Sequence, residues 1–230
     1  MSKKIKIKGL PSAGISNIKF LARGKRGVIH TGILIFRGKR IKVAIKSKLP
    51  ESRAESRIEN EGKWLKLVNK KGIGPQVIKS SKNYVMYKFI EGDFLLDFVS
   101  RSDVTKEQIL DILKNIFGQL YVLDMLGVNK GEMHHPVKHI IVEEKLVRNK
   151  TVKGDQIEFI PMLIDFERCY ESHRPKNVTQ FCQFFLNGKI RVPLEQKGIF
   201  VDKELLLERA KEYKKRMTET KLNKITELFC

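Results

Sequence analysis

Two ionisable residues stand at the ends of apolar segments, where a folded chain would hold them rigidly. Lys46 follows the run Val43-Ala44-Ile45, which has the composition of a strand. Asp165 follows a second apolar run, residues 159–164. A lysine fixed at a strand end is a point charge for phosphate groups, and a carboxylate after a buried strand can hold Mg²⁺. The two residues together indicate chemistry on a phosphorylated ligand.

A glycine-containing basic segment precedes the strand of Lys46. Gly24 and Gly27 flank Lys25, within the pattern Ala22-x-Gly24-x-x-Gly27-x-Ile29. Glycines let backbone N–H groups approach phosphate oxygens closely. The segment lies between apolar runs and not before a helix, which disfavours a dinucleotide-binding turn. A basic hairpin turn without function is the alternative interpretation.

A lysine at a strand end needs an acidic partner that fixes its rotamer. Glu61 is the best candidate, because it lies one turn before the apolar stripe of a helix predicted over residues 52–71. Glu59 is the alternative. Taken alone, Lys46 could also be an ordinary solvated lysine.

A polar loop over residues 127–139 offers further candidates. Glu132 could act as a general base, and Lys138 could stabilise a γ-phosphate. Pro136 argues against a helical pair of metal ligands, and no fourth ligand is evident, so a zinc site is not favoured. The loop also contains three histidines: His134, His135 and His139.

The pattern of apolar residues predicts a β-rich first part and a mostly helical second part. Residues 1–48 have short apolar runs with glycine turns, and residues 83–90 form another β-like run. Thr105 and Gln108 have the spacing of a capping box at the start of a helix that should end near Gly127. Further segments are a hairpin of 139–142 with 157–164, and helices over about 178–186 and 202–229.

The composition favours a cytoplasmic protein that binds phosphate-containing partners. The net charge is +20, and residues 1–50 carry 14 Lys or Arg and no acid. Such a field should attract nucleotide, RNA or an acidic partner, although a solubility surface is an equal alternative. No apolar window is long enough to cross a bilayer, and no signal peptide is evident. The cysteines lack metal-site or disulfide spacing: Cys169, Cys182 and Cys230.

Over about residues 20–185 these motifs resemble the protein-kinase-like superfamily, most closely its small atypical members, such as the RIO kinases and short archaeal predicted serine/threonine kinases. The resemblance implies an α+β, bilobal fold with a β-rich lobe at 1–90 and a mostly helical lobe at 91–230. It also implies ATP and Mg²⁺ as cofactors. Met86 is similar to the gatekeeper, and Tyr87 to Phe89 to the hinge whose backbone meets adenine. The implied nucleotide-binding residues are Gly24, Lys25, Gly27, Lys46, Glu61, Met86, Tyr87 and Phe89.

The same resemblance implies catalytic roles for Lys46, Glu132, Lys138 and Asp165, and metal binding by Asp165 and His139. The chain departs from the family pattern at three places. Lys130-Gly131-Glu132 replaces the H-R-D triplet, Val137 replaces an Asn, and Glu167 replaces the glycine of D-F-G. Three functions therefore stay open: a serine/threonine kinase acting on an unknown protein or itself, an ATP-binding pseudokinase that contacts RNA or ribonucleoprotein, and a plain RNA-binding domain.

Overall fold

The computed structural model describes residues 7–10, 14–24, 27–49, 56–148, 155–186 and 188–229. The chain divides into two compact units. The N-terminal unit comprises Met1–Ile90 together with Asp165–Cys169, and the C-terminal unit comprises Glu91–Ile164 together with Tyr170–Cys230. The short segment around Asp165 therefore belongs with the strands and helix that precede residue 91.

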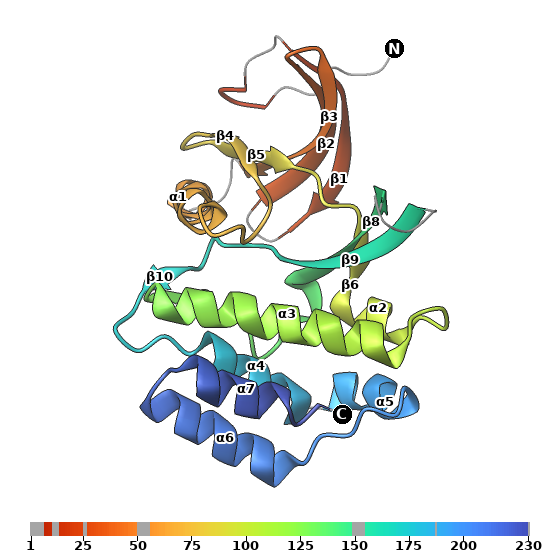
Figure 1. Ribbon diagram of the computed structural model, residues 1–230. Helices are drawn as coiled ribbons and strands as arrows, with labels where there is room; N and C mark the ends of the chain where they lie inside the picture. The colour runs from red at the N-terminus through yellow and green to blue at the C-terminus, as the bar shows by residue number, and fades with distance from the viewer. Residues whose placement is uncertain are drawn as a thin grey trace. The chain divides into compact units, whose positions relative to one another are not determined.

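The N-terminal unit is an antiparallel five-stranded sheet with one helix, drawn in red to yellow in Figure 1. Its strand order is β1-β2-β3-β5-β4. Helix α1 packs against β3, β4 and β5. The elements are β1 (Ile15–Arg23), β2 (Gly27–Phe36), β3 (Lys39–Lys48), α1 (Arg57–Asn69), β4 (Val77–Ser80) and β5 (Tyr84–Lys88).

Alternation of side chains along β3 gives the two faces of this sheet different environments. Val43 and Ile45 point to one face, where they form a buried apolar core with Tyr84 and Met86. Lys46 points to the opposite face. The period of two thus directs Lys46 away from this apolar core.

The C-terminal unit combines a three-stranded sheet, a two-stranded pairing and several helices around the long helix α3 (Figure 1). The three-stranded sheet has the order β6-β8-β9, and β10 pairs with β7. The first elements of the C-terminal unit are β6 (Gly92–Phe94), α2 (Leu95–Ser100), α3 (Lys106–Met125), β7 (Val128–Asn129) and a 3₁₀ turn, η1 (Pro136–Lys138). The others are β8 (Ile140–Arg148), β9 (Asp155–Leu163), β10 (Tyr170–Glu171), α4 (Asn177–Leu186), α5 (Gly188–Gln196), α6 (Lys203–Lys215) and α7 (Glu219–Thr226).

The start of α3 has the predicted capping box. The Thr105 hydroxyl accepts a hydrogen bond from the Gln108 backbone N–H, and the Gln108 side chain accepts one from the Thr105 N–H. The helix ends before Gly127, whose φ of 69° is a conformation that favours glycine. One side of α3 is buried, and its Phe117 stacks on Phe185 of α4.

The predicted fold class is confirmed, because the structure is α+β with a β-rich N-terminal unit and a mostly helical C-terminal unit, as the resemblance implies. The hairpin of residues 139–164 is also present, as β8 and β9. The single helix predicted over 202–229 is wrong: it is divided into α6 and α7, because Thr218 begins a new helix by accepting from the Lys221 N–H. Helices α2 and α5 were not predicted.

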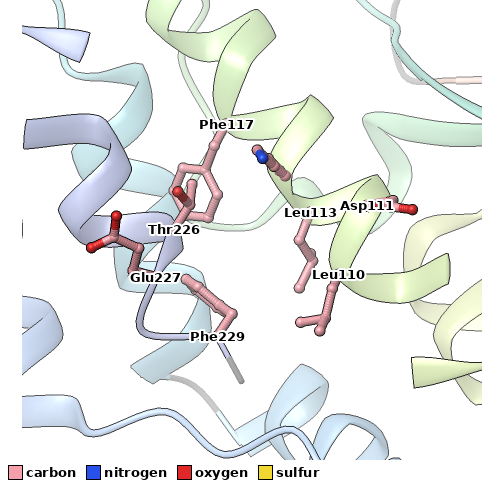
Figure 2. Close-up of a pocket in the computed structure, with 8 residues that line it drawn as sticks. Leu110, Asp111, Leu113, Phe117, Thr226, Glu227 and Phe229 are labelled. Atoms are coloured by element: carbon pink, nitrogen blue, oxygen red, sulfur yellow. The ribbon is translucent and has the colours of Figure 1, made fainter. Parts of the chain in front are cut away.

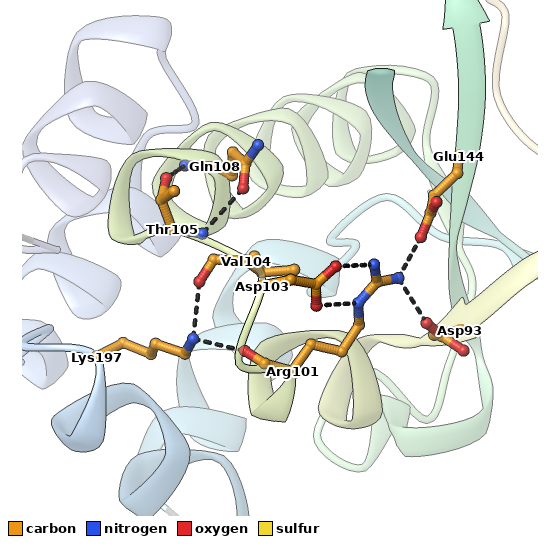
Figure 3. Close-up of polar contacts among 8 residues, drawn as sticks. All are labelled: Asp93, Arg101, Asp103, Val104, Thr105, Gln108, Glu144 and Lys197. Atoms are coloured by element: carbon orange, nitrogen blue, oxygen red, sulfur yellow. Dashed lines mark hydrogen bonds and ion pairs between the residues drawn. The ribbon is translucent and has the colours of Figure 1, made fainter. Parts of the chain in front are cut away.

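Arg101 connects the small sheet of the C-terminal unit to the start of α3 (Figure 3). Its guanidinium binds Asp103 at 2.5 Å and Asp93 at 3.0 Å, and it also contacts Glu144 of β8. Lys197 donates to the backbone carbonyl oxygens of Arg101 and Val104 at 2.5 and 2.7 Å. These contacts fix the link that runs from α2 to α3.

Among the described residues, no helix combines the length and the apolar character that a membrane span requires.

Gly92 provides a test of the β6–β8 pairing. A Cβ at this position would overlap the Val142 carbonyl group and lie 3.0 Å from the Cα of Glu143. We expect Gly92→Ala to lower the free energy of unfolding by about 1–3 kcal/mol. Gly118→Ala is the matched control, because an added Cβ in that helix meets nothing within 4 Å, and it should stabilise by about 0.5–1 kcal/mol. Urea denaturation measures both, and equal effects of the two substitutions would contradict this packing.

Candidate functional site

Lys46 is surrounded by three carboxylates of the N-terminal unit. Its Nζ lies 2.8 Å from Oε2 of Glu61, 2.9 Å from Oδ1 of Asp165 and 3.1 Å from Oε2 of Glu167. The lysine side chain is 11% exposed and that of Glu61 is 2% exposed. The predicted ion pair of Lys46 with Glu61 is therefore present, and Asp165 joins it although it is 119 positions away in the sequence.

A glycine lets α1 bring Glu61 to the sheet. A Cβ on Gly62 would lie 2.8 Å from the Cβ of Ser80 in β4, which is closer than real side chains approach. Only a residue without a side chain can stand there at this separation. The close approach of α1 places the neighbouring Glu61 beside Lys46.

The segment of Asp165 is attached to α1 by side chains of that helix. The Asn60 amide donates to the carbonyl oxygens of Glu167 at 2.9 Å and Cys169 at 3.0 Å, and Trp64 donates to the Asn60 side-chain oxygen. Phe166 is fully buried. Asp165 itself has a φ of 62°, an uncommon conformation for a residue other than glycine. The helix that carries Glu61 thus also holds Asp165 and Glu167.

Burial and charge act in opposite directions within this cluster. Burial raises the pKa of Glu61 to about 7, although the positive charge of Lys46 lowers it. Burial alone would lower the pKa of Lys46, but the carboxylates of Glu61, Asp165 and Glu167 outweigh it and raise that pKa. Lys46 therefore stays charged, and Glu61 is the carboxylate whose protonation responds to pH near neutrality.

The same three carboxylates offer oxygen ligands for a cation. Glu61, Asp165 and Glu167 each offer an oxygen within 4.8 Å of the others. Hard divalent cations such as Mg²⁺ prefer carboxylate oxygens. Asp165 has the most exposed side chain of the three, at 35%. Within the described residues no other group of this kind is found, and His139 does not belong to it.

Gly24 follows the last residue of β1, and Gly27 is the first residue of β2. The Gly24 N–H donates to the Gly27 carbonyl oxygen at 2.9 Å. A Cβ on Gly27 would lie 2.9 Å from the carbonyl oxygen of Ser47 in β3, so this position also requires glycine. Ile29 of β2 pairs with Lys46 across the sheet. Lys25 lies outside the described residues.

The register of β3 with β5 places Met86 and Tyr87, two of the predicted adenine-binding residues, on opposite faces of the sheet. Met86 pairs with Ile45 and is buried in the apolar core on the face opposite Lys46. Val85 pairs with Lys46, so Val85 and Tyr87 share its face. Burial, followed by the charges of Glu61 and Asp165, raises the pKa of Tyr87, although the positive charge of Lys46 lowers it. Tyr87, rather than Met86, is the β5 residue that faces the cluster from this unit.

Phe89 follows β5 and has two contacts with β3. Its N–H donates to the Lys42 carbonyl oxygen at 3.0 Å, and the Lys42 ammonium lies 4.4 Å from the centre of its ring. The backbone of the predicted hinge is thus partly engaged with the sheet of its own unit.

The C-terminal unit holds the predicted catalytic loop. Glu132 has a φ of 58°, and its Oε2 lies 3.5 Å from Nε2 of His139. Lys138 is exposed at the end of η1. The loop therefore brings Glu132 and His139 together, whereas Lys138 faces solvent.

A buried polar network fixes the start of this loop. Asp124 of α3 accepts hydrogen bonds from the Asn177 backbone and amide at 2.9 and 2.8 Å, and from the Tyr213 hydroxyl at 3.0 Å. Asn177 in turn accepts from the Lys130 N–H at 2.8 Å and donates to the Val128 carbonyl. Burial raises the pKa of Asp124. Helices α3, α4 and α6 thus position the backbone two residues before Glu132.

A separate cavity lies between α3 and the segment after α7 (Figure 2). Its volume is about 190 Å³, and its apolar lining includes Leu110, Leu113, Phe117 and Phe229. None of the predicted site residues lines it. Exposed charged residues also line it, so the cavity opens at the surface of the helices: Asp111, Lys114 and Glu227.

Three important side chains were not predicted from the sequence. Glu167 was noted only as the residue that replaces the glycine of D-F-G. Tyr87 was predicted to contact adenine only through its backbone, and Asp124 was not singled out. An acid two residues after Asp165 was the one available indication of a larger carboxylate cluster. The roles of Tyr87 and Asp124 depend on sheet register and on helix packing.

No protein-family model and no curated protein matches the chain. Among solved structures, a crystal structure of the kinase domain of PF14_0431 is similar, with a TM-score of 0.49 and 16% sequence identity. The match covers 74% of this chain and 55% of that chain. The chain thus spans little more than half the length of that kinase domain.

The raised pKa of Glu61 predicts how stability depends on pH. A glutamate ionises near pH 4.3 in an unfolded chain and Glu61 near pH 7 in the folded protein. The folded state therefore binds more protons between these values, and the free energy of unfolding should fall as pH rises through this range. Glu61→Gln should flatten this fall by about 1 kcal/mol per pH unit at most.

The measurement is urea denaturation at several pH values between about 4 and 8. Glu59→Gln, at an exposed position of the same helix, is the matched control and should keep the wild-type slope. Parallel curves for wild type and Glu61→Gln would show that Glu61 ionises normally.

Proposed function

We propose that this protein is an ATP- and Mg²⁺-dependent kinase that transfers the γ-phosphate to a serine or threonine hydroxyl, on a protein substrate or on itself. The observation that carries the proposal is the position of Lys46 Nζ, 2.8 Å from Glu61 and 2.9 Å from Asp165. Protein kinases need such a strand lysine paired with a helix glutamate, and an aspartate for Mg²⁺.

The N-terminal unit supplies the groups for nucleotide binding in this proposal. Lys46 would bind the α- and β-phosphates, held in place by Glu61. Gly24 and Gly27 offer backbone groups at the ends of β1 and β2, near Ile29, the cross-strand neighbour of Lys46. Asp165 would bind the cation, which when present neutralises charge on the phosphates. Tyr87 would limit the space beside the adenine.

The C-terminal unit supplies the general base. Glu132 would take the proton of the acceptor hydroxyl, an assignment that rests on the order of motifs along the chain. His139, 3.5 Å from that carboxylate, is suited to orient it. The exposed Lys138 is available to a phosphate only if its side chain moves, so its role depends on the bound state.

ATP binding is the first requirement of the proposal. Saturating Mg²⁺-ATP should raise the melting temperature by about 5–10 °C, because a ligand that binds only the folded state stabilises it. Lys46→Met should remove most of this shift, measured against its own ligand-free melting temperature. Lys39→Met, at the exposed start of the same strand, is the control and should keep it. An unchanged shift in Lys46→Met would exclude the assigned phosphate site.

Slow phosphoryl transfer is the second requirement. With radiolabelled ATP, wild type should label itself on Ser or Thr, and Glu132→Gln should be slower by about 10²–10⁴. Asp165→Asn should abolish labelling, whereas His135→Gln in the same loop should retain it.

Two outcomes would decide against this mechanism. Equal labelling of wild type, Glu132→Gln and Asp165→Asn would point to a contaminating kinase. Tight ATP binding with no labelling of wild type would favour an ATP-binding pseudokinase, which is consistent with the replaced H-R-D triplet.

A further inference from the structure

Glu167 is shared by two cations of the N-terminal unit. Its Oε2 lies 3.1 Å from Nζ of Lys46, and its Oε1 lies 3.5 Å from Nη1 of Arg57. The side chain of Glu167 is 11% exposed, whereas that of Arg57 is 33% exposed. One carboxylate thus connects the buried ammonium to a guanidinium nearer the surface.

The N–H groups of the Lys46 ammonium are matched by carboxylate oxygens. A lysine ammonium has three donors, and three carboxylates have an oxygen within 3.1 Å of this one: Glu61, Asp165 and Glu167. A phosphate oxygen that accepts a hydrogen bond from Lys46 must therefore take the place of one of them.

Glu167 is the carboxylate best placed to release the lysine. Glu61 is only 2% exposed, and a charge buried so deeply is costly without its partner. Asp165 keeps its place in the proposed function because it binds the cation. Glu167 already contacts a second cation, so its charge stays paired when it leaves Lys46. Its backbone carbonyl is held by Asn60, so the exchange needs a rotation of the side chain alone.

A polar cavity gives the Glu167 side chain room to move. The cavity has a volume of about 510 Å³ and lies beside the first turn of α1, where Ser56, Arg57 and Glu167 are among the residues that line it. A carboxylate that turns from Lys46 into this cavity stays beside the guanidinium and gains contact with water. The exchange therefore does not leave a buried charge without compensation.

We propose that Glu167 is an internal competitor of the nucleotide phosphates: it binds Lys46 in the ligand-free protein and turns to Arg57 when a phosphate oxygen takes its place. The inference rests on the proposed function for the identity of the anion, while the exchange itself depends on the contacts of Lys46. It assigns a role to the residue that stands where the glycine of D-F-G is expected.

The test is isothermal titration calorimetry of wild type and Glu167→Gln, a variant that keeps the side-chain shape and removes its charge. The ligands are ATP, with Mg²⁺ and separately with EDTA, and sodium tripolyphosphate with EDTA, which presents phosphates without a nucleoside. Glu59→Gln, at an exposed position of α1, removes the same charge and is the matched control. The melting temperature of each ligand-free variant shows that it is folded.

Glu167→Gln should bind ATP and tripolyphosphate about 10-fold more tightly than wild type, with and without Mg²⁺. The reason is that a phosphate no longer has to replace a hydrogen bond between two charged groups. Glu59→Gln should change the affinity by less than about 2-fold, because an exposed charge is screened by salt.

A double-mutant cycle tests the role of Arg57. Arg57→Gln should weaken tripolyphosphate binding by about 3-fold in the wild-type background, because Glu167 then has lost the partner that receives it. In the Glu167→Gln background the same substitution should have no effect. Equal losses in the two backgrounds would show that Arg57 contacts the phosphates itself, and would overturn the proposed exchange.

Two further results would overturn the proposal. Tripolyphosphate affinity that is unchanged or lower in Glu167→Gln would show that the carboxylate does not compete for Lys46. ATP affinity that falls with Mg²⁺ but not with EDTA would make Glu167 a ligand of the cation instead.

Failure of the proposed function would be distinguishable from failure of this inference. If neither wild type nor Glu167→Gln bound ATP, but Glu167→Gln bound tripolyphosphate more tightly than wild type, the competition would be supported and the nucleotide excluded. If ATP binding depended on Lys46 but was indifferent to Glu167, the nucleotide site would stand and the competition would be excluded.

Discussion

The buried ammonium of Lys46 is the constraint on which the N-terminal unit depends. A charge taken out of water is costly unless opposite charges and hydrogen bonds replace its hydration. Glu61 from α1, and Asp165 and Glu167 from a segment far along the chain, provide that replacement. The requirement explains why residues 165–169 belong to this unit and why α1 approaches the sheet closely enough to need Gly62.

The same electrostatics connects the fold to the proposed function. Lys46 and Arg57 do not balance the three carboxylates, so an excess of negative charge remains that a divalent cation can relieve. Helix α1 fixes both partners, because Glu61 is on the helix and its Asn60 holds the backbone of Glu167. A displacement of α1 would therefore disturb Lys46 and Asp165 together.

Local patterns in the sequence predicted local structure well. The spacing of Thr105 and Gln108 is sufficient for a capping box, and a strand lysine with a helix glutamate predicted the Lys46–Glu61 pair. Features that depend on register or distant contacts were not accessible. The face on which Met86 lies follows from its pairing with Ile45, and the buried Asp124 is explained only by α4 and α6 packing beside it.

The central claim is that Lys46 and Asp165 hold a nucleotide and its cation. The most direct test is a crystal structure with a non-hydrolysable ATP analogue and Mn²⁺ in place of Mg²⁺, with the metal located by anomalous scattering. The account predicts Mn²⁺ bonded to a carboxylate oxygen of Asp165 and a phosphate oxygen within hydrogen-bond distance of Lys46 Nζ. Nucleotide bound elsewhere, or Mn²⁺ held by His139 and its neighbours without Asp165, would contradict it.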